Sequence, residues 1–195
     1  MKVTQMFRRR FARVTVGLLL LALTGIAAAE PPASGRFDLR SVETRLVDDV
    51  YRLDAIARLE LSPRARDALE GGIALVIALE VEILRERAWW LDAEVATVRR
   101  RLRLERHELS QQYIVINLST GERRSFHRPR TALDFIGRGL DFPIIDAVVI
   151  DDPERYYGRA RMRLEREALP WALRPAALVF GDWRLQTGWV TWSFD

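Results

Sequence analysis

Two histidines are the side chains of this chain best suited to acid–base chemistry, and each has a serine close to it in the sequence. Ser110 follows His107, and Ser125 precedes His127. A nucleophilic serine needs an imidazole against its hydroxyl and a carboxylate that orients the ring. Neither serine has the Gly-x-Ser-x-Gly context of a nucleophile elbow. Ser125 and His127 would share a strand face simply because they are two residues apart. We therefore expect no enzymatic activity and no catalytic residues.

Metal-ligating side chains are equally sparse. The chain has no cysteine, and its histidines lack the spacing of a zinc site. Asp151, Asp152 and Glu154 offer hard oxygen ligands, but without the Asp-x-Asp-x-Asp-Gly loop that binds calcium in an EF-hand. Aspartate and proline together are typical of a solvated turn. The sequence predicts no metal site and no cofactor.

Six tryptophans and a run of arginines are the remaining residues that suit recognition. Tryptophan and arginine are enriched where proteins bind partners, but a tryptophan also buries a large area in a core. The sequence leaves both interpretations open. The candidate partner surface consists of Trp89, Trp90, Asp92, Arg99, Arg101, Arg103, Asp182, Trp183 and Trp189.

The charge distribution argues against nucleic acid as a partner. The chain carries 31 Lys and Arg against 27 Asp and Glu, a net charge of +4. Five of the cations, and none of the acids, lie in residues 1–29. The remainder has a net charge of −1, which lacks the basic field of a nucleic-acid-binding domain.

Residues 1–29 have the layout of a secretory signal peptide. A short basic region precedes an apolar run, Val14 to Ala27, and small residues at Ala27 and Ala29 favour cleavage before Glu30. The apolar run is short for a membrane span, which needs about 20 residues. We expect a periplasmic protein with no stable membrane span after cleavage; an uncleaved N-terminal anchor is the alternative.

Alternation of apolar and polar residues predicts strands along most of the remaining chain. Residues 37–47 and 50–61 form the first pair, and residues 73–84 form a central strand because their first half is apolar on both faces. Residues 93–106, a hairpin around 119–122, and strands in 142–150 and 155–167 follow, the last two paired across Asp151–Glu154. Residues 182–194 form the closing strand.

Two short helices interrupt the strands. Ser62 is an N-cap, Pro63 suits the first helical position, and Gly71 ends the first helix. Residues 129–139 form the second. The chain is therefore predicted to be mainly β: an antiparallel β-sandwich or barrel-like fold of 8–9 strands with two short helices. Its parts are a signal peptide, 1–29, a flexible lead-in, 30–36, and one β-rich domain, 37–195.

The arginines of residues 97–109 fit one solvent-facing strand face. Arg99, Arg101 and Arg103 alternate with apolar residues, and Glu80, Glu82 and Glu165 on neighbouring strands can balance them by cross-strand pairing. Arg100 breaks the pattern. We expect it to have an acidic partner or to lie near a sheet edge.

Four stretches, taken in order and spacing, resemble a known family: residues 53–92, 99–126, 156–175 and 181–194. The chain resembles exported bacterial proteins of family 4390 of the domains of unknown function. The resemblance implies an envelope protein with a signal peptide and a β-rich domain, and it implies no enzyme activity. Family members are often encoded near a nitrogen-regulation-type sensor kinase, which hints at an envelope partner.

The expected function is that of a non-enzymatic envelope protein that binds another protein, with a link to an envelope sensor kinase as one possibility. The alternative is a carrier of an apolar small molecule, held in a cavity between the sheets or in a barrel mouth. An apolar cavity of several hundred Å³, roughly, would distinguish the carrier from the binding protein.

Overall fold

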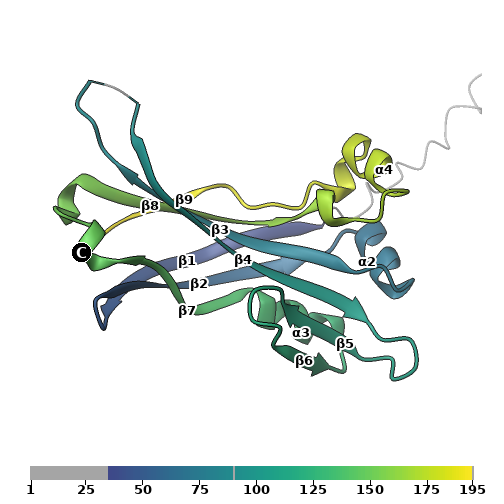
Figure 1. Ribbon diagram of the computed structural model, residues 1–195. Coiled ribbons are helices and arrows are strands. Elements are labelled where there is room, and N and C mark those ends of the chain that lie inside the picture. Colours follow the sequence, from purple (N-terminus) through teal and green to yellow (C-terminus); the bar gives the residue numbers. More distant parts are fainter. Residues whose placement is uncertain (1–34, 90, 195) are drawn as a thin grey trace, which may run out of the picture. The chain divides into compact units, whose positions relative to one another are not determined.

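The structure is a computed structural model that describes residues 35–89 and 91–194. The predicted leader, most of the lead-in and Trp90 lie outside the described residues. The described residues contain nine strands in two antiparallel sheets, which confirms the predicted sandwich. Figure 1 shows the two sheets as facing layers.

The smaller sheet has three strands in the order β1–β2–β7. β1 (Arg36–Val47) and β2 (Val50–Glu60) form the predicted hairpin. Its turn places Asp48 and Asp49 in the left-handed region, at φ 50° and 60°. Two positive φ angles match the right-handed twist of a hairpin, and aspartate tolerates them better than most residues. β7 (Arg138–Asp146) pairs with the other side of β2.

The larger sheet has six strands in the order β6–β5–β4–β3–β8–β9. β3 lies inside it and is buried along most of its length, as the two-sided apolar pattern predicts. The bounds are β3 Leu75–Arg85, β4 Ala93–Arg106, β5 Tyr113–Asn117, β6 Arg123–Phe126, β8 Tyr156–Leu164 and β9 Val190–Ser193.

Two predictions about the C-terminal half are wrong. β7 and β8 do not pair with each other, because β7 adds to β2 and β8 adds to β3. Between them the short 3₁₀ turns η1 (Ala147–Val149) and η2 (Pro153–Arg155) carry the chain from one sheet to the other. The closing strand is also shorter than predicted, since only β9 and an isolated bridge at Gln186 pair with β8.

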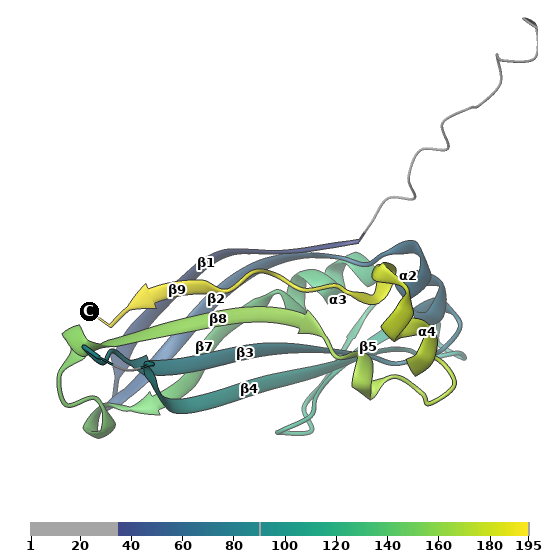
Figure 2. The same cartoon turned by 90° about the horizontal axis from the view of Figure 1, so that it is seen from above.

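Three short helices gather at one end of the sheets (Figures 1 and 2). In α2 (Pro63–Glu70) the buried Ser62 hydroxyl accepts a hydrogen bond from Ala65 N, as the predicted N-cap requires. α3 (Pro129–Ile136) is the second predicted helix, and α4 (Arg174–Val179) is a third in a stretch for which the sequence allows a loop or a helical turn. The 3₁₀ turns η3 (Arg166–Ala168) and η4 (Gly181–Trp183) flank α4.

The core lies between the two sheets. Leu53 of the smaller sheet and Leu79 and Val81 of the larger one have at most 2% of their surface exposed. Around these residues the space between the sheets is filled by packed side chains. The outward face of the larger sheet is left to interact with its surroundings.

Candidate functional site

The predicted arginines lie on the outward face of the larger sheet. Arg99, Arg101 and Arg103 of β4 stand across β3 from Arg159, Arg161 and Arg163 of β8, because each strand alternates its side chains between the core and the outside. We call these six residues the arginine face. β3 contributes the carboxylates between them.

Glu80 lies at the centre of the arginine face and is 2% exposed. Its carboxylate is held by Arg99 Nε at 3.0 Å, Arg161 Nε at 2.6 Å and Arg163 Nε at 3.1 Å. Burial by itself favours the neutral acid, but the hydrogen bond from Arg161 and the charges of Arg163 and Arg161 outweigh it. The pKa of Glu80 is therefore lowered, and the carboxylate is ionised at neutral pH.

The two other predicted acidic partners also form ion pairs. The carboxylate of Glu82 accepts a hydrogen bond from Arg159 Nε at 2.6 Å. The carboxylate of Glu165 accepts two from Arg101, from Nε at 2.9 Å and from an Nη at 2.6 Å. The prediction is confirmed for Glu80 and Glu165, which pair with Arg99 and Arg101, whereas Glu82 pairs with Arg159 of β8 and not with the predicted row. These pairs fix the arginine side chains in position.

Trp189 extends the arginine face beyond β8. The guanidinium groups of Arg161 and Arg159 lie 4.3 and 4.8 Å from its ring centre. Such stacking is favourable because the ring face is electron-rich. The predicted residues Arg99, Arg101, Arg103 and Trp189 therefore share one surface.

A pocket of about 410 Å³ opens at the helical end of the arginine face. Arg101 and Arg103 of β4 and Arg174 of α4 line it together with apolar residues that include Val76, Leu169 and Pro170. Arg174 is positioned by a hydrogen bond from its Nε to the carbonyl of Leu169, at 2.8 Å. We call this the arginine pocket, and it suits a ligand with both a carboxylate and an apolar part.

Trp183 and Asp182 do not belong to this surface. Trp183 is 4% exposed and packs in the core, so its prediction as a surface residue is wrong. The short turn η4 directs its indole inward at the helical end. Asp182 pairs instead with Arg64 of α2, at 3.2 Å.

Trp89 and Asp92 lie at the other end of the molecule, in the β3–β4 turn. Trp89 is 92% exposed, and Asp92 accepts a hydrogen bond from the Tyr157 hydroxyl at 2.7 Å. This turn is at the far end of the sheet from the helices (Figure 1), and Tyr157 is on the same face of β8 as Arg159, so Asp92 borders the arginine face at that end. The described residues of the predicted partner surface thus lie toward both ends of the larger sheet, apart from Asp182 and the buried Trp183.

Arg100 points toward the core side of the larger sheet and is half-buried. It pairs with Leu79 of β3, while the partner strand β5 begins its pairing only at Leu102. The predicted position near a sheet edge is confirmed. Burial lowers the pKa of Arg100, and the charge of Glu122 partly opposes this.

The two serine–histidine pairs lie in exposed segments. Ser110 Oγ is 3.2 Å from His107 Nδ1, and the Ser110 backbone N–H donates to the same nitrogen at 3.3 Å. Both contacts lie within the turn that joins β4 to β5. In the part of the chain that the structure describes, no three His, Cys, Asp or Glu side chains are grouped to hold a metal ion.

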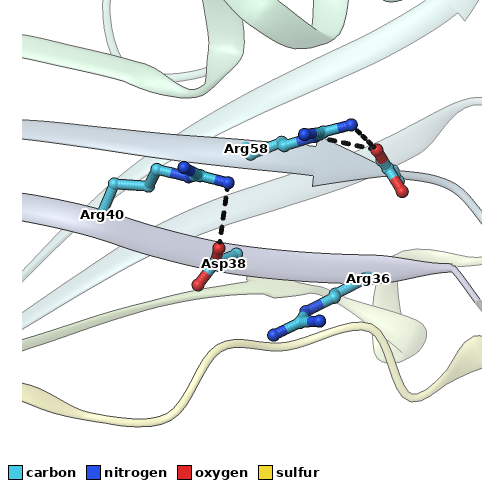
Figure 3. Close-up of a pocket in the computed structure, with 5 residues that line it drawn as sticks. Arg36, Asp38, Arg40 and Arg58 are labelled. Carbon is cyan, nitrogen blue, oxygen red and sulfur yellow. Dashed lines mark hydrogen bonds and ion pairs between the residues drawn. The ribbon is translucent and has the colours of Figure 1, made fainter.

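A second charged pocket lies on the outward face of the smaller sheet (Figure 3). It has a volume of about 370 Å³. Asp38 pairs with Arg40 at 3.4 Å, and Glu60 pairs with Arg58 at 2.6 Å, so acids inside the pocket already neutralise these cations. The lining of the arginine pocket contains no acid, although Arg101 there is paired with Glu165 from outside the lining.

Sequence reasoning did not assign the β8 arginines and Arg174 to the candidate surface. The β8 residues carry the same signal as Arg99 to Arg103, a period-two row of arginines. Arg174 has no such signal, since only the fold brings α4 beside β4.

The fold defines a mainly β class of protein: two antiparallel sheets with an arginine-rich outer face. Within that class, the chain belongs to the family described as domain of unknown function DUF4390, whose model matches residues 34–193. Comparisons with curated proteins and with solved structures gave no match. None of the helices within the described ranges is both long and apolar enough to span a membrane.

Proposed function

We propose that this is an exported, non-enzymatic envelope protein that acts by binding another protein through the arginine face. The arginine pocket carries the proposal, because three arginines and several apolar side chains converge there without an acid in the lining. Such a pocket would bind an acidic side chain and its apolar neighbour on the partner. An envelope sensor kinase is one candidate partner.

The exposure of the ion-paired arginines supports a role in binding a partner in addition to a structural one. Arg99 and Arg101 hold buried carboxylates, yet their side chains remain 54% and 44% exposed. A guanidinium has five N–H donors in a fixed fork, so donors remain for an incoming carboxylate. Ion pairs that already hold the side chains also reduce the entropy lost on binding.

A carrier of an apolar molecule would need an apolar cavity, and the layers around Leu79 are packed and inaccessible. Leu59, Leu61 and Leu133 line a further pocket of about 440 Å³, which is the place left for such a ligand. The arginine pocket is charged and lies on the outside of the larger sheet.

Site-specific photo-crosslinking in living cells tests the proposal. A photo-reactive residue at Arg103 should give one reproducible adduct of defined mass, because this exposed side chain lines the arginine pocket. The matched control is the same residue at Arg36, an exposed arginine in the pocket of the smaller sheet. The substitution Arg174→Glu should remove the adduct at position 103. An identical adduct pattern at both positions, or none at position 103, would contradict the proposal.

A further inference from the structure

The long strand β4 has one edge that is open over half its length. β3 pairs with it from Ala93 to Leu104, but β5 pairs only with Leu102 to Arg106. Beside Ala93–Arg100, no other described strand lies on the side away from β3. Figure 2 shows this part of β4 at the margin of the two-sheet unit.

Backbone groups of two residues point to this open edge. The carbonyl of Arg101 accepts from Leu118 N at 3.0 Å, which places Arg101 on the β5 side of the strand. Successive residues of a strand direct their backbone N–H and C=O groups to opposite neighbouring strands. The backbone groups of Arg99 and Thr97 therefore point to the same edge as those of Arg101. Their N–H and C=O groups have no backbone partner among the described residues and can receive another strand.

The smaller sheet also has an edge on this side, but β7 is unsuited to pairing. α3 contacts both β5 and β7, which places the two on the same flank. Pro143 has no N–H to donate, and Asp141 has a positive φ of 53° that breaks the extended backbone. Of these two edges, β4 is therefore the one with the capacity to accept a strand.

The side chains along the open edge define what such a strand must carry. Arg99 lies on the outward face, whereas Val98 and Ala96 face inward and are partly buried against the core. Arg100 also points inward, and a charge in that position protects an edge against indiscriminate pairing. An incoming strand must offer a carboxylate beside Arg99 and apolar side chains beside Val98 and Ala96, and its other end lies beside the exposed Glu94.

We propose that the open edge of β4, Ala93–Arg100, accepts an extended segment of the partner protein as an added strand in which acidic and apolar residues alternate. This inference rests on the proposed function and names the form in which the partner binds. Main-chain hydrogen bonds to Thr97 and Arg99 would give affinity, and the alternating side chains would give specificity. The added strand would lie directly beside the arginine face.

Fluorescence anisotropy with a labelled synthetic peptide of alternating glutamate and valine tests the inference. The purified chain should bind it, and should not bind a peptide of alternating lysine and valine. Thr97→Pro removes the N–H that faces the open edge and none that faces β3, and should weaken binding at least about tenfold. Thr97→Ala is the matched control, because it loses the hydroxyl contact with Glu94 but keeps the N–H.

Several results would overturn the inference. Equal affinity of Thr97→Pro and the unmodified chain would exclude the edge, as would equal binding of both peptides. If Thr97→Pro fails to fold, hydrogen exchange in the unmodified chain is the deciding measurement. The acidic peptide should protect the amides of Thr97 and Arg99 from exchange. Unchanged exchange rates would contradict the proposed strand addition. A dimer in sedimentation that Thr97→Pro abolishes would identify a second copy of the chain as the occupant instead.

The inference and the proposed function can fail separately. If Thr97→Pro keeps the crosslinked adduct at position 103 while Arg174→Glu removes it, the partner binds the arginine pocket without adding a strand. If neither change affects an adduct, both proposals are wrong.

Discussion

At the scale of single residues, Glu80 has the largest consequences. It is a buried carboxylate that three arginines share, so its loss leaves several guanidinium groups without their partner. Removing one member of a buried charged group costs far more than removing an exposed pair. Glu80 thus connects the stability of the larger sheet to the shape of the arginine face.

Glu80→Gln should lower the free energy of unfolding by about 2 kcal/mol, since the arginines keep only a neutral acceptor in a buried position. Urea denaturation measures this. Glu60→Gln is the control, because that side chain is 43% exposed beside Arg58 and should cost less than about 0.5 kcal/mol. Equal losses in the two variants would show that burial of Glu80 has no energetic effect.

The same residue should make stability depend on acid pH. Its pKa in the folded chain lies below the ordinary value of 4.5, mainly because the arginines outweigh the effect of burial. The stabilisation is therefore complete above about pH 4.5 and is lost as the pH falls through the folded-state pKa. As the pH falls below about 5, the unmodified chain should lose stability more steeply than Glu80→Gln. Parallel pH profiles would contradict the lowered pKa.

At the scale of elements, residue patterns predicted strands well and their partners less well. The hairpin of β1 and β2 and the bounds of β4 were predictable because alternation and turn residues are local signals. The pairing of β7 with β2 was not, since those strands are far apart in the sequence and the Asp-Pro turn after β7 resembles a hairpin. The burial of Trp183 and the place of Arg174 depend on packing between distant segments in the same way.

The pairing of β8 with β9 depends on one glycine. A Cβ added at Gly158 would overlap the ring of Trp192 on β9. Gly158→Ala should therefore displace that indole and lower the free energy of unfolding by about 2 kcal/mol. Tryptophan fluorescence and urea denaturation would report the two effects. At Gly188 an added Cβ meets nothing within 4 Å, so Gly188→Ala should leave the fluorescence unchanged.

At the scale of the whole molecule, the candidate residues are spread along the length of the larger sheet. The helices and the arginine pocket lie at one end, and the exposed Trp89 and Leu91 lie at the other. The candidate surface predicted from sequence was one group because residue types carry no information on which end of a sheet they occupy. Only the fold shows how far apart along the sheet these residues lie.

Export is the expectation that concerns the entire chain. Residues 1–29, fused to a reporter enzyme that needs disulfides to fold, should give active reporter, because disulfides persist outside the cytoplasm. Mass spectrometry of the chain from cells should find Glu30 at its N-terminus. An inactive reporter would contradict the proposed location, and an active reporter with an intact N-terminus would favour the anchor.

The carboxylate at the centre of the arginine face also constrains how the sequence can change over evolution. Glu80 contacts arginines on both neighbouring strands, so a substitution at any one of these positions alters the charge balance of the others. Single replacements would be selected against, whereas a joint change to apolar residues would preserve the packing. Positions 80, 99, 161 and 163 should therefore covary among related sequences, because the four side chains share one contact.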